Sequence, residues 1–550
     1  MREGKEGTGT PRRMKAINDK THFAPGRTLA ASVQALLSGH DTHMPSTPSL
    51  SPVRSKNDGR QTLSLAEASF IPLSVRNEVK ELNALPVAPS SDIVEAAVLM
   101  ADISGFSRLS ETLRNEFGDS KGNEMFASQV SKSFTALVGI VSKYGGEVVK
   151  FAGDCLICVF VNDEENEDEE DDDGHFHRSK QCARVLLDVI KGASDTLDLH
   201  GGLKVGNIQR LHLKELKRGS PRTKSARARL QTSSDGRMTL KQLEEQRARW
   251  YCIAGKPLKT AGALLDKAPA GEIHVFGGEI ISRNTTPPKV DDTKAPRQSS
   301  LSLKLLDTGC PLVARTYLPP IVRARFRTSD VTVDSFQTEH RDVVTAFISL
   351  PGIFAKSSKA KGIDAGLLND TYSALMGICR KHEGVLRDFL FEDKGCTMIC
   401  CWGVVNTNEF DALRCVLFGL EAVAAMSTLN EKVKIGISMG KCLVLPIGNE
   451  RRRDWTVMGT EVNMSARLCA KAPVRSALCS ETVYEATKDH VNFDMSAPMK
   501  LKGRDGEHRA LKALNKKSGI IRRKIDANII IESALGMNDF STLSAAAKRY

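Results

Sequence analysis

The sequence predicts an α+β fold made of two similar units, each an antiparallel sheet covered by helices on one face. Three observations support this prediction. Apolar runs of strand length alternate with longer segments of helical periodicity. In each half these elements follow the order strand, helix, hairpin, helix, strand, which is typical of ferredoxin-like α+β domains. The second half also repeats short motifs of the first half in the same order.

Composition places the chain among globular proteins. Hydrophobic residues make up 41% of the 550 residues and charged residues 26%, which suits a globular protein in water. No run of about 18 apolar residues occurs, so we expect no membrane span, and the basic N-terminus lacks the apolar core of a secretory signal. The thirteen cysteines show no repeated spacing, and the one CxxC pair, Cys155 and Cys158, has no second pair. We therefore expect reduced thiols in the cytoplasm rather than disulfides or zinc.

The charge of +12 is concentrated in the segment from Lys204 to Arg249 and in the two ends of the chain, while residues 163–173 are almost entirely acidic. No aromatic residues alternate with the basic ones and no known nucleic-acid module is present, so we expect no nucleic-acid partner. We interpret both charged segments as solvated loops. A calcium site in the acidic segment is the alternative, but the segment lacks the glycine of an EF-hand loop.

Changes in composition divide the chain into a series of segments. Residues rich in Ser, Pro and basic side chains cannot bury enough apolar surface to fold, whereas apolar periodicity marks folded domains. The predicted segments are a disordered tail at 1–68, a helical lead-in at 69–92, a first domain at 93–320 with an acidic insert at 162–177 and a basic insert at 208–249, a linker at 321–338, a second domain at 339–515, and a C-terminal tail at 516–550.

The lead-in carries apolar residues suited to a short helix that begins near Pro72. The first domain is then predicted to begin with a buried strand that ends at Asp102, followed by a turn and an amphipathic helix. Its further elements are a helix over 121–144, a hairpin over 147–161 with its turn at 153–154, a helix over 181–192, strands at 201–207 and 250–255, a helix to 267, and a strand at 272–276.

Two carboxylates are presented where predicted strands end. Asp102 follows an apolar run and precedes the small residues Ser104 and Gly105, and Asp154 lies in the hairpin turn. A carboxylate before a helix N-terminus can hold a cation while the free N–H groups of the first turn face an anion. A buried strand that ends in a capping aspartate is the alternative interpretation of Asp102 alone.

The repeat shows where the two halves differ. VLMADISGFS is matched by VVTAFISLPG at 343–352, and KFAGDCLICVF by FEDKGCTMICCWG at 391–403. In this alignment Phe347 and Cys396 replace the two carboxylates. The second half cannot therefore hold the same cation.

The second half in turn carries groups that the first lacks. Asn463 and Arg467 lie four residues apart, on one face of a predicted helix, where the first half has Lys259 and Ala263. Because each half lacks what the other keeps, we expect a single composite site between them.

The motifs ADISGFS, KFAGD, DKGC and TVMGTEVNMSAR, in this order, resemble the class III nucleotidyl cyclases. The resemblance is closest to the soluble, bicarbonate-responsive adenylyl cyclases with tandem catalytic domains, and it covers residues 69–515. It implies two ferredoxin-like cyclase homology domains packed as a pseudo-twofold intramolecular dimer, which could act as a monomer. It also implies a cytoplasmic lyase that converts ATP to 3′,5′-cyclic AMP and pyrophosphate.

The resemblance further implies a role for each site residue. Two Mg²⁺ ions, for which Mn²⁺ can substitute, would be held by Asp102, Asp154 and the backbone carbonyl of Ile103, and would assist attack of the ribose 3′-hydroxyl on the α-phosphate. Arg467 would stabilise the transition state and Asn463 would orient the ribose. The remaining nucleotide contacts would be Ser104, Gly105, Phe106, Ser107 and Lys204 to the phosphates, and Lys394, Thr456 and Val457 to the adenine.

The chain departs from this pattern at one place. Lys150 matches a lysine that contacts bicarbonate, but no Arg or Lys lies between Thr260 and Leu265 to act as its partner. Two alternatives to an adenylyl cyclase stay open at this point. One is a guanylyl cyclase, and the other is a nucleotide-binding pseudocyclase without turnover.

Overall fold

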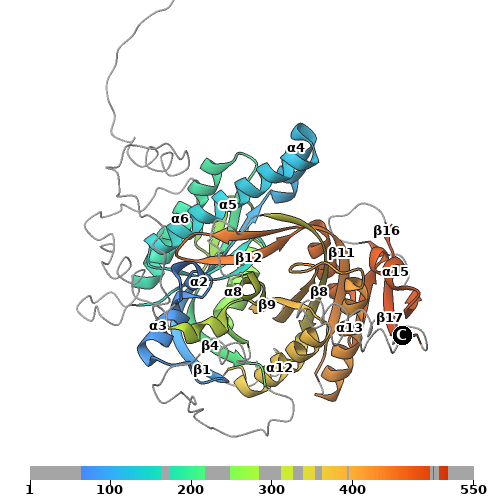
Figure 1. The fold of residues 1–550 in the computed structure, drawn as a ribbon. Coiled ribbons are helices and arrows are strands. Elements are labelled where there is room, and N and C mark those ends of the chain that lie inside the picture. The colour runs from blue at the N-terminus through green and yellow to red at the C-terminus, as the bar shows by residue number, and fades with distance from the viewer. Residues whose placement is uncertain are drawn as a thin grey trace, which may run out of the picture. The chain divides into compact units, whose positions relative to one another are not determined.

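The computed structural model describes ten stretches of the chain: residues 63–162, 174–216, 248–283, 311–325, 338–353, 362–392, 395–429, 431–495, 499–500 and 507–517. Within them the fold is α+β, with two large sheets and flanking helices (Figure 1). Most of the predicted N-terminal tail, most of both inserts and most of the C-terminal tail lie outside the described residues.

The first sheet has seven strands in the order β2-β3-β1-β4-β6-β7, with β5 paired to β4. All neighbours are antiparallel except β4 and β6, which are parallel. Its elements are β1 (Ser90–Ser104), α4 (Phe106–Phe117), α5 (Asp119–Lys143), β2 (Glu147–Ala152), β3 (Cys155–Phe160), α6 (Gly174–Ala193), β4 (Asp198–Lys214), β5 (Arg249–Ala254), α8 (Lys256–Leu265), β6 (Glu272–Val275) and β7 (Ile280–Ser282).

The second sheet has eight strands in the order β14-β17-β13-β11-β8-β10-β9, with β12 paired to β11. Its inner order, β9-β10-β8-β11-β13, repeats the order β2-β3-β1-β4-β6 of the first sheet, which confirms the predicted repeat. Its elements are β8 (Glu339–Leu350), α12 (Ala365–Lys381), β9 (Val385–Glu392), β10 (Gly395–Trp402), α13 (Asp411–Thr428), β11 (Lys434–Gly448), β12 (Arg453–Met458), α14 (Thr460–Lys471), β13 (Ser476–Ser480), α15 (Glu481–Thr487), β14 (Val491–Met495) and β17 (Ala510–Lys516), beside a small ladder of β15 (Met499–Lys500) and β16 (Glu507–His508).

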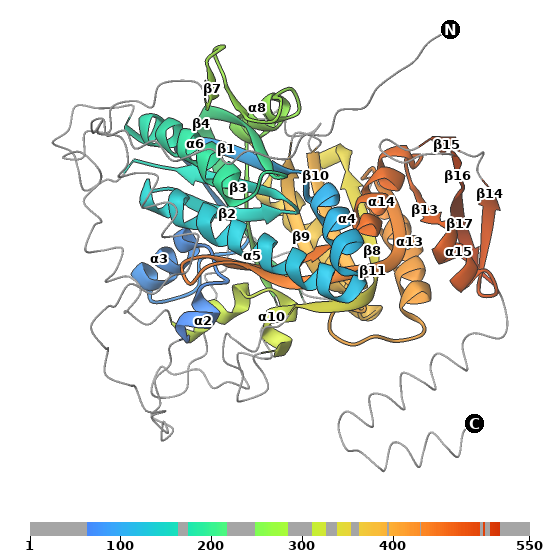
Figure 2. The same ribbon diagram turned by 90° about the horizontal axis from the view of Figure 1, so that it is seen from above.

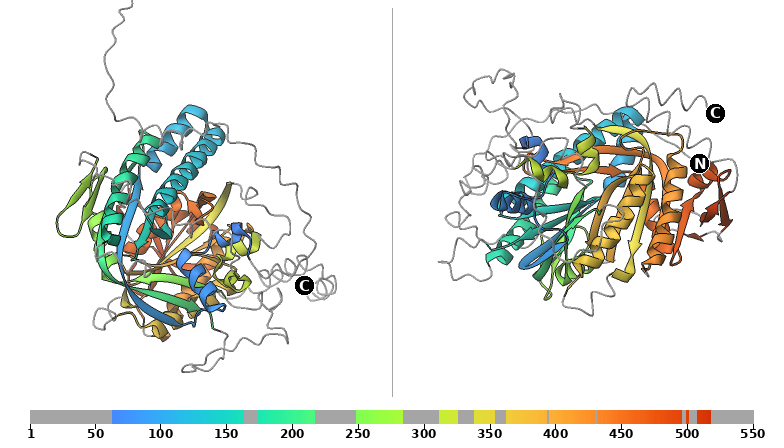
Figure 3. Two further views of the ribbon diagram at one scale, coloured as in Figure 1. Left: turned by 90° about the vertical axis from the view of Figure 1, so that its left-hand side faces the viewer. Right: turned by 60° about the horizontal axis from the view of Figure 1, so that its bottom comes forward.

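Helices cover both faces of the first sheet, so the prediction of a single covered face is wrong. Leu99 and Ala101 of β1 pack into the core formed with α4, α5 and α6, and Figures 2 and 3 show these helices together on the sheet. Val98 and Met100 point the opposite way and pack with Leu258 of α8. The reason is that β1 carries apolar residues at successive positions, which is typical of a strand buried on both faces.

The lead-in and the segment before the second sheet form a shared apolar layer. Its helices are α2 (Leu65–Ala68), α3 (Leu73–Leu82), the 3₁₀ helix η1 (Leu312–Tyr317) and α10 (Pro320–Arg325). The helix predicted near Pro72 is confirmed, since α3 begins directly after it. Phe70 and Ile71 pack with Trp455 and Val457 of β12, so the lead-in contacts the second unit as well as the first.

Several predicted boundaries shift because their residues belong to regular elements. Gly174–His177, assigned to the acidic insert, form the first turn of α6, where His175 is buried. Residues 208–214 of the predicted basic insert continue β4. At the other boundaries, Arg249 begins β5 and Lys516 ends β17. Helix α10 extends from residue 320 into the first five residues of the predicted linker, and α2 occupies part of the predicted tail.

Two further expectations concern membrane-spanning helices and the cysteines. Among the described residues, no helix is long and apolar enough to cross a membrane. All twelve cysteines in the described part of the chain are buried and none forms a disulfide, and burial raises the pKa of the Cys158 thiol. Cys310 lies outside the described residues.

Candidate active site

The structure brings the two predicted carboxylates together. Asp102 lies near the end of β1 and is paired across the ladder with Cys155, the residue that follows Asp154. The backbone N–H of Ile103 donates a 3.2 Å hydrogen bond to the carbonyl oxygen of Asp154. The strand end and the hairpin turn therefore present both carboxyl groups at one place.

The charge around this pair favours a cation. Withdrawal from water raises the pKa of Asp154, and the hydrogen bond with Asp102 and the charge of His200 offset only part of this rise. The Nε2 atom of His200 lies 3.8 Å from Oδ2 of Asp102, but burial lowers the pKa of His200. Two adjacent carboxylates match the donor set that Mg²⁺ takes together with substrate phosphates.

In the ranges that the structure covers, no group of three or more His, Cys, Asp or Glu side chains is arranged to hold a metal ion. The structure therefore shows a pair of carboxylates here, Asp102 and Asp154, and not a complete set of metal ligands. This pair fits a divalent ion that draws its other ligands from water or phosphate.

The turn after Asp102 has the geometry predicted for it. Gly105 caps the N-terminus of α4 with φ 103°, and a Cβ atom there would collide with the carbonyl oxygen of Thr196. Phe106 is buried and packs edge-on against Phe126 at 6.0 Å between ring centroids. Ser107 is exposed. The N–H groups of the first turn have no partner within the helix, so they are available to an anion.

The groups predicted from the second half lie on β12 and α14. Thr456 is 1% exposed and Val457 is 7% exposed, the latter within the apolar layer formed with the lead-in. Asn463 is exposed and Arg467 is half-buried. No hydrogen bond or ion pair joins either of these two side chains to another described residue. Lys394 lies outside the described residues, between β9 and β10 in the sequence.

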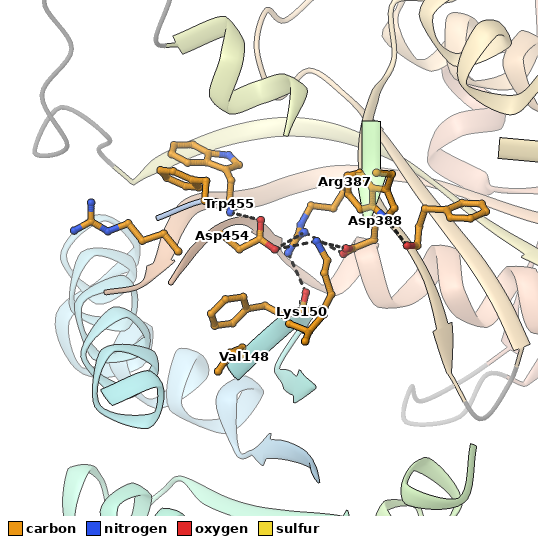
Figure 4. Close-up of polar contacts among 12 residues, drawn as sticks. Val148, Lys150, Arg387, Asp388, Asp454 and Trp455 are labelled. Atoms are coloured by element: carbon orange, nitrogen blue, oxygen red, sulfur yellow. Dashed lines mark hydrogen bonds and ion pairs between the residues drawn. The ribbon is translucent and has the colours of Figure 1, made fainter. Parts of the chain in front are cut away.

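Strands β2 and β12 connect the two halves. Arg452, the residue before β12, donates hydrogen bonds to the carbonyl oxygens of Val148 and Val149 at 2.9 and 3.0 Å. Two residues further along, Nζ of Lys150 lies 2.9 Å from Oδ2 of Asp454. Figure 4 shows the contact of Lys150 with Asp454. These contacts show that β2 and β12 run in the same direction where they meet. The turn that follows β2 and the helix that follows β12 therefore lie at the same end of this pair of strands.

The structure does not bring the other predicted site residues into contact with one another. None of the described hydrogen bonds or ion pairs joins Asp102 or Asp154 to Thr456, Asn463 or Arg467. Nζ of Lys204 lies 3.6 Å from the centroid of the Phe276 ring, and no described contact joins it to the carboxylates.

The strand register corrects one part of the sequence alignment. Gly202 in β4 and Gly436 in β11 occupy equivalent places, since a Cβ at either would collide with a backbone carbonyl of α8 or α14. Gly202 lies opposite Met100, and Gly436 lies opposite Phe347. Phe347 is therefore the counterpart of Met100, not of Asp102.

The counterpart of Asp102 is Ser349, two residues further along β8. Ser349 lies opposite Thr397, as Asp102 lies opposite Cys155. Cys396, which precedes Thr397, keeps its place as the counterpart of Asp154. Neither counterpart is a carboxylate, so the second half still lacks this pair.

Sequence reasoning missed the charged residues buried between the two units. These are Arg387 and Asp388 in β9, together with Arg452 and Asp454. Their signal is weak but present: VLRDFLF and RRRDWTV place charged residues inside apolar strand segments.

Comparisons with known proteins agree with this fold. Residues 336–513 match the adenylate and guanylate cyclase catalytic domain family. The chain is 20% identical over 455 residues to adenylate cyclase type 10 of Homo sapiens and 21% identical over 456 residues to that of Oryctolagus cuniculus. Each match covers 76% of this chain and 26% of the relative, so the chain spans about a quarter of the length of these relatives.

Solved structures are similar at low identity. The adenylyl cyclase CyaB of Pseudomonas aeruginosa matches at 22% identity and a TM-score of 0.31, covering 34% of this chain and 99% of its own. A class III adenylyl cyclase-like ATP-binding protein of Pseudomonas aeruginosa matches at 13% identity and a TM-score of 0.44, covering 72% of this chain and 85% of its own. The family match is confined to residues 336–513, which form most of the second unit.

Proposed function

We propose that the chain is an adenylyl cyclase that converts ATP to 3′,5′-cyclic AMP and pyrophosphate, acting in the cytoplasm and as a monomer. The observation that carries the proposal is the proximity of Asp102 and Asp154, which the pairing of β1 with β3 brings together beside the N-terminus of α4. The second half carries the complementary groups, Asn463 and Arg467. The side chains of both have no partner among the described residues. Both halves are needed for a complete site.

The carboxylates of Asp102 and Asp154, with the carbonyl oxygen of Ile103, would hold Mg²⁺ or Mn²⁺. Two such ions, when bound, lower the pKa of the ribose 3′-hydroxyl and neutralise charge on the triphosphate. The N–H groups of Phe106 and Ser107 bind phosphate oxygens, because they face away from α4 without internal partners.

The groups on β12 and α14 act on the rest of the nucleotide. Arg467 donates hydrogen bonds to the α-phosphate, where negative charge develops in the transition state. Asn463 orients the ribose. Thr456 and Lys394 contact the polar edge of the adenine and Val457 its ring, while Lys204 is assigned to the phosphates by resemblance alone.

The deciding experiment is a product assay on the full chain with Mg²⁺ or Mn²⁺ and either ATP or GTP. We expect cyclic AMP from ATP. Cyclic GMP from GTP, with no cyclic AMP from ATP, would identify a guanylyl cyclase instead. Binding of ATP without product under either metal would indicate a pseudocyclase.

We expect Lys394→Glu to abolish ATP turnover, because a carboxylate cannot donate a hydrogen bond to an adenine ring nitrogen.

Arg467→Ala is expected to lower kcat by ~10²- to 10³-fold with a smaller change in KM, because the guanidinium acts on charge that develops during the reaction. Steady-state kinetics with ATP measure both constants. Lys471→Ala is the matched control, since Lys471 is an exposed cation one turn further along α14. An equal fall in both variants, or a change confined to KM, would contradict the assigned role.

Bicarbonate is expected to leave turnover unchanged. The Lys150 ammonium already forms ion pairs with Asp388 at 2.6 Å and Asp454 at 2.9 Å, so an added anion would have to displace a carboxylate held within the fold. Initial rates with sodium bicarbonate, compared with sodium chloride at the same pH and ionic strength, measure the effect. A rise specific to bicarbonate would show that the anion gains access to Lys150.

A further inference from the structure

Four charged side chains from three strands meet between the two units. They are Lys150 of β2, Arg387 and Asp388 of β9, and Asp454 of β12, here called the ion quartet (Figure 4). Nζ of Lys150 lies 2.6 Å from Oδ1 of Asp388 and 2.9 Å from Oδ2 of Asp454. Nη1 of Arg387 lies 3.0 Å from Oδ2 of Asp388 and 3.5 Å from Oδ2 of Asp454. Each cation thus contacts both carboxylates.

The ion quartet is buried and its charges balance. The exposed fractions of the side chains are 13% for Lys150, 9% for Arg387 and 2% for each aspartate. Nζ of Lys150 also lies 4.9 Å from the centroid of the Trp250 ring. Two cations and two carboxylates give no net charge, which is how charges are tolerated away from water.

Stability alone is a weak reason for such a group. Apolar side chains of similar volume often stabilise a protein core as well as a buried ion pair does, whereas ion pairs fix the orientation of the segments that carry them. Burial by itself raises the pKa of Asp454, but the charges of Lys150, Arg387 and Arg452 outweigh it and lower that pKa to about 2. Asp454 is therefore ionised throughout the neutral range.

The three strands of the ion quartet are the strands that lead to the proposed active site. β2 continues from Lys150 into the turn that contains Asp154. β12 continues from Asp454 to Thr456 and then to α14. β9 ends at Glu392, two residues before Lys394 in the sequence, which itself lies outside the described residues. One set of contacts is thus positioned to set the distance between the carboxylate half and the base-binding half.

We infer that the ion quartet is a set of positioning residues, which holds the carboxylates of the first unit in register with the nucleotide-binding groups of the second. This inference rests on the proposed function for its catalytic consequence. The residues of the ion quartet do not touch the reacting atoms. Their effect on turnover would be exerted through the strands that they join.

The test separates the effect of an unbalanced buried charge from the effect of losing the contacts between the strands. Lys150→Gln and Asp388→Asn each leave one unbalanced buried charge, whereas the double variant K150Q/D388N is neutral and keeps the Arg387–Asp454 contact. We expect both single variants to lower Tm and the double variant to recover most of that loss. We expect kcat of the double variant to stay ~10- to 100-fold below that of the unaltered chain, because the ion pairs of Lys150 in β2 with Asp388 of β9 and Asp454 of β12 are lost. The control is K381Q/E421Q, which removes an ion pair of 2.7 Å at the surface.

A second measurement does not depend on turnover. Spin labels on cysteines introduced at the exposed residues Glu116 and Lys471 report the distance between the two units, with Cys310 replaced by serine and the described cysteines buried. We expect a narrow distance distribution in the unaltered chain and a shifted or broader one in K150Q/D388N. An unchanged distribution in the double variant, or recovery of kcat together with Tm, would overturn the inference. A changed distribution in a chain that makes no cyclic AMP would support the positioning role and refute the proposed function.

Discussion

Replacement of Asp102 by asparagine is expected to reduce cyclic AMP formation by about 10³-fold while the fold is retained. Asparagine has nearly the same shape, but it is neutral and a far weaker ligand for a hard divalent cation. The Asp102 side chain is 24% exposed at the end of β1, and asparagine fills the same space there. The effect therefore falls on metal binding and not on packing.

Two measurements separate the loss of turnover from the loss of metal affinity in Asp102→Asn. Initial rates with Mg²⁺ and ATP give the loss of turnover, and electron paramagnetic resonance of Mn²⁺ with an unreactive ATP analogue gives the loss of metal affinity. The matched control is Asp92→Asn, on the same strand, where the carboxylate pairs with Arg210 at the surface. Surface pairs contribute at most about 1 kcal/mol, so this variant should keep its activity. Turnover of Asp102→Asn within about tenfold of the unaltered chain, or unaltered Mn²⁺ affinity, would remove Asp102 from the metal site.

The parts of the site that sequence could predict are those with local signals. A strand, an acid, a glycine with positive φ and an amphipathic helix follow one another directly, and the structure contains them in that order as β1, Asp102, Gly105 and α4. The Gly153–Asp154 turn was likewise predictable, because it separates two short apolar strands. The pairing of β1 with β3 then places Asp102 close to Asp154.

The alignment of Phe347 with Asp102 failed for a physical reason. Side chains alternate along a strand, so a shift of two residues leaves every side chain on the same face of the sheet. The apolar pattern of β8 fits both alignments equally, and the shared Ile-Ser dipeptide favoured the wrong one. Only the close approach of Gly202 and Gly436 to a helix backbone distinguishes them.

The ion quartet could not be predicted because its members are far apart in sequence. Lys150 is one polar residue in an amphipathic strand, and Arg387 and Asp388 are adjacent residues that would normally face opposite sides of a strand. Nothing local indicates that Asp454 faces Lys150. Their pairing depends on how the two units meet, which the apolar periodicity of either unit does not specify.

Replacement of Arg452 by methionine is expected to cause the largest loss of stability among single changes at this interface. The Arg452 side chain is buried, and its guanidinium donates hydrogen bonds to the carbonyl oxygens of Val148, Val149 and Phe70 at 2.9, 3.0 and 3.3 Å. It therefore joins β2 of the first unit, the lead-in segment and β12. Burial lowers the pKa of Arg452, which reflects the penalty for holding this charge away from water.

β2 is an edge strand of its sheet, and the carbonyl oxygens on its open side need donors from elsewhere. Methionine fills a similar volume but donates no hydrogen bond, so these buried acceptors would be left unpaired. Each unpaired buried group costs ~1–3 kcal/mol, and we expect the free energy of unfolding to fall by ~3–5 kcal/mol. The midpoint and slope of urea denaturation, followed by circular dichroism, measure this change.

Arg451→Met is the matched control, because Arg451 is the preceding residue and its side chain has no described partner. Arg452→Lys gives the intermediate case: it keeps the charge, but a single ammonium cannot reach carbonyls on both β2 and the lead-in in the planar geometry of a guanidinium. The order of stability should be Arg451→Met, then Arg452→Lys, then Arg452→Met. Equal stability of Arg452→Met and Arg451→Met would mean that water or other donors satisfy the edge of β2, and that the guanidinium does not hold the two units together.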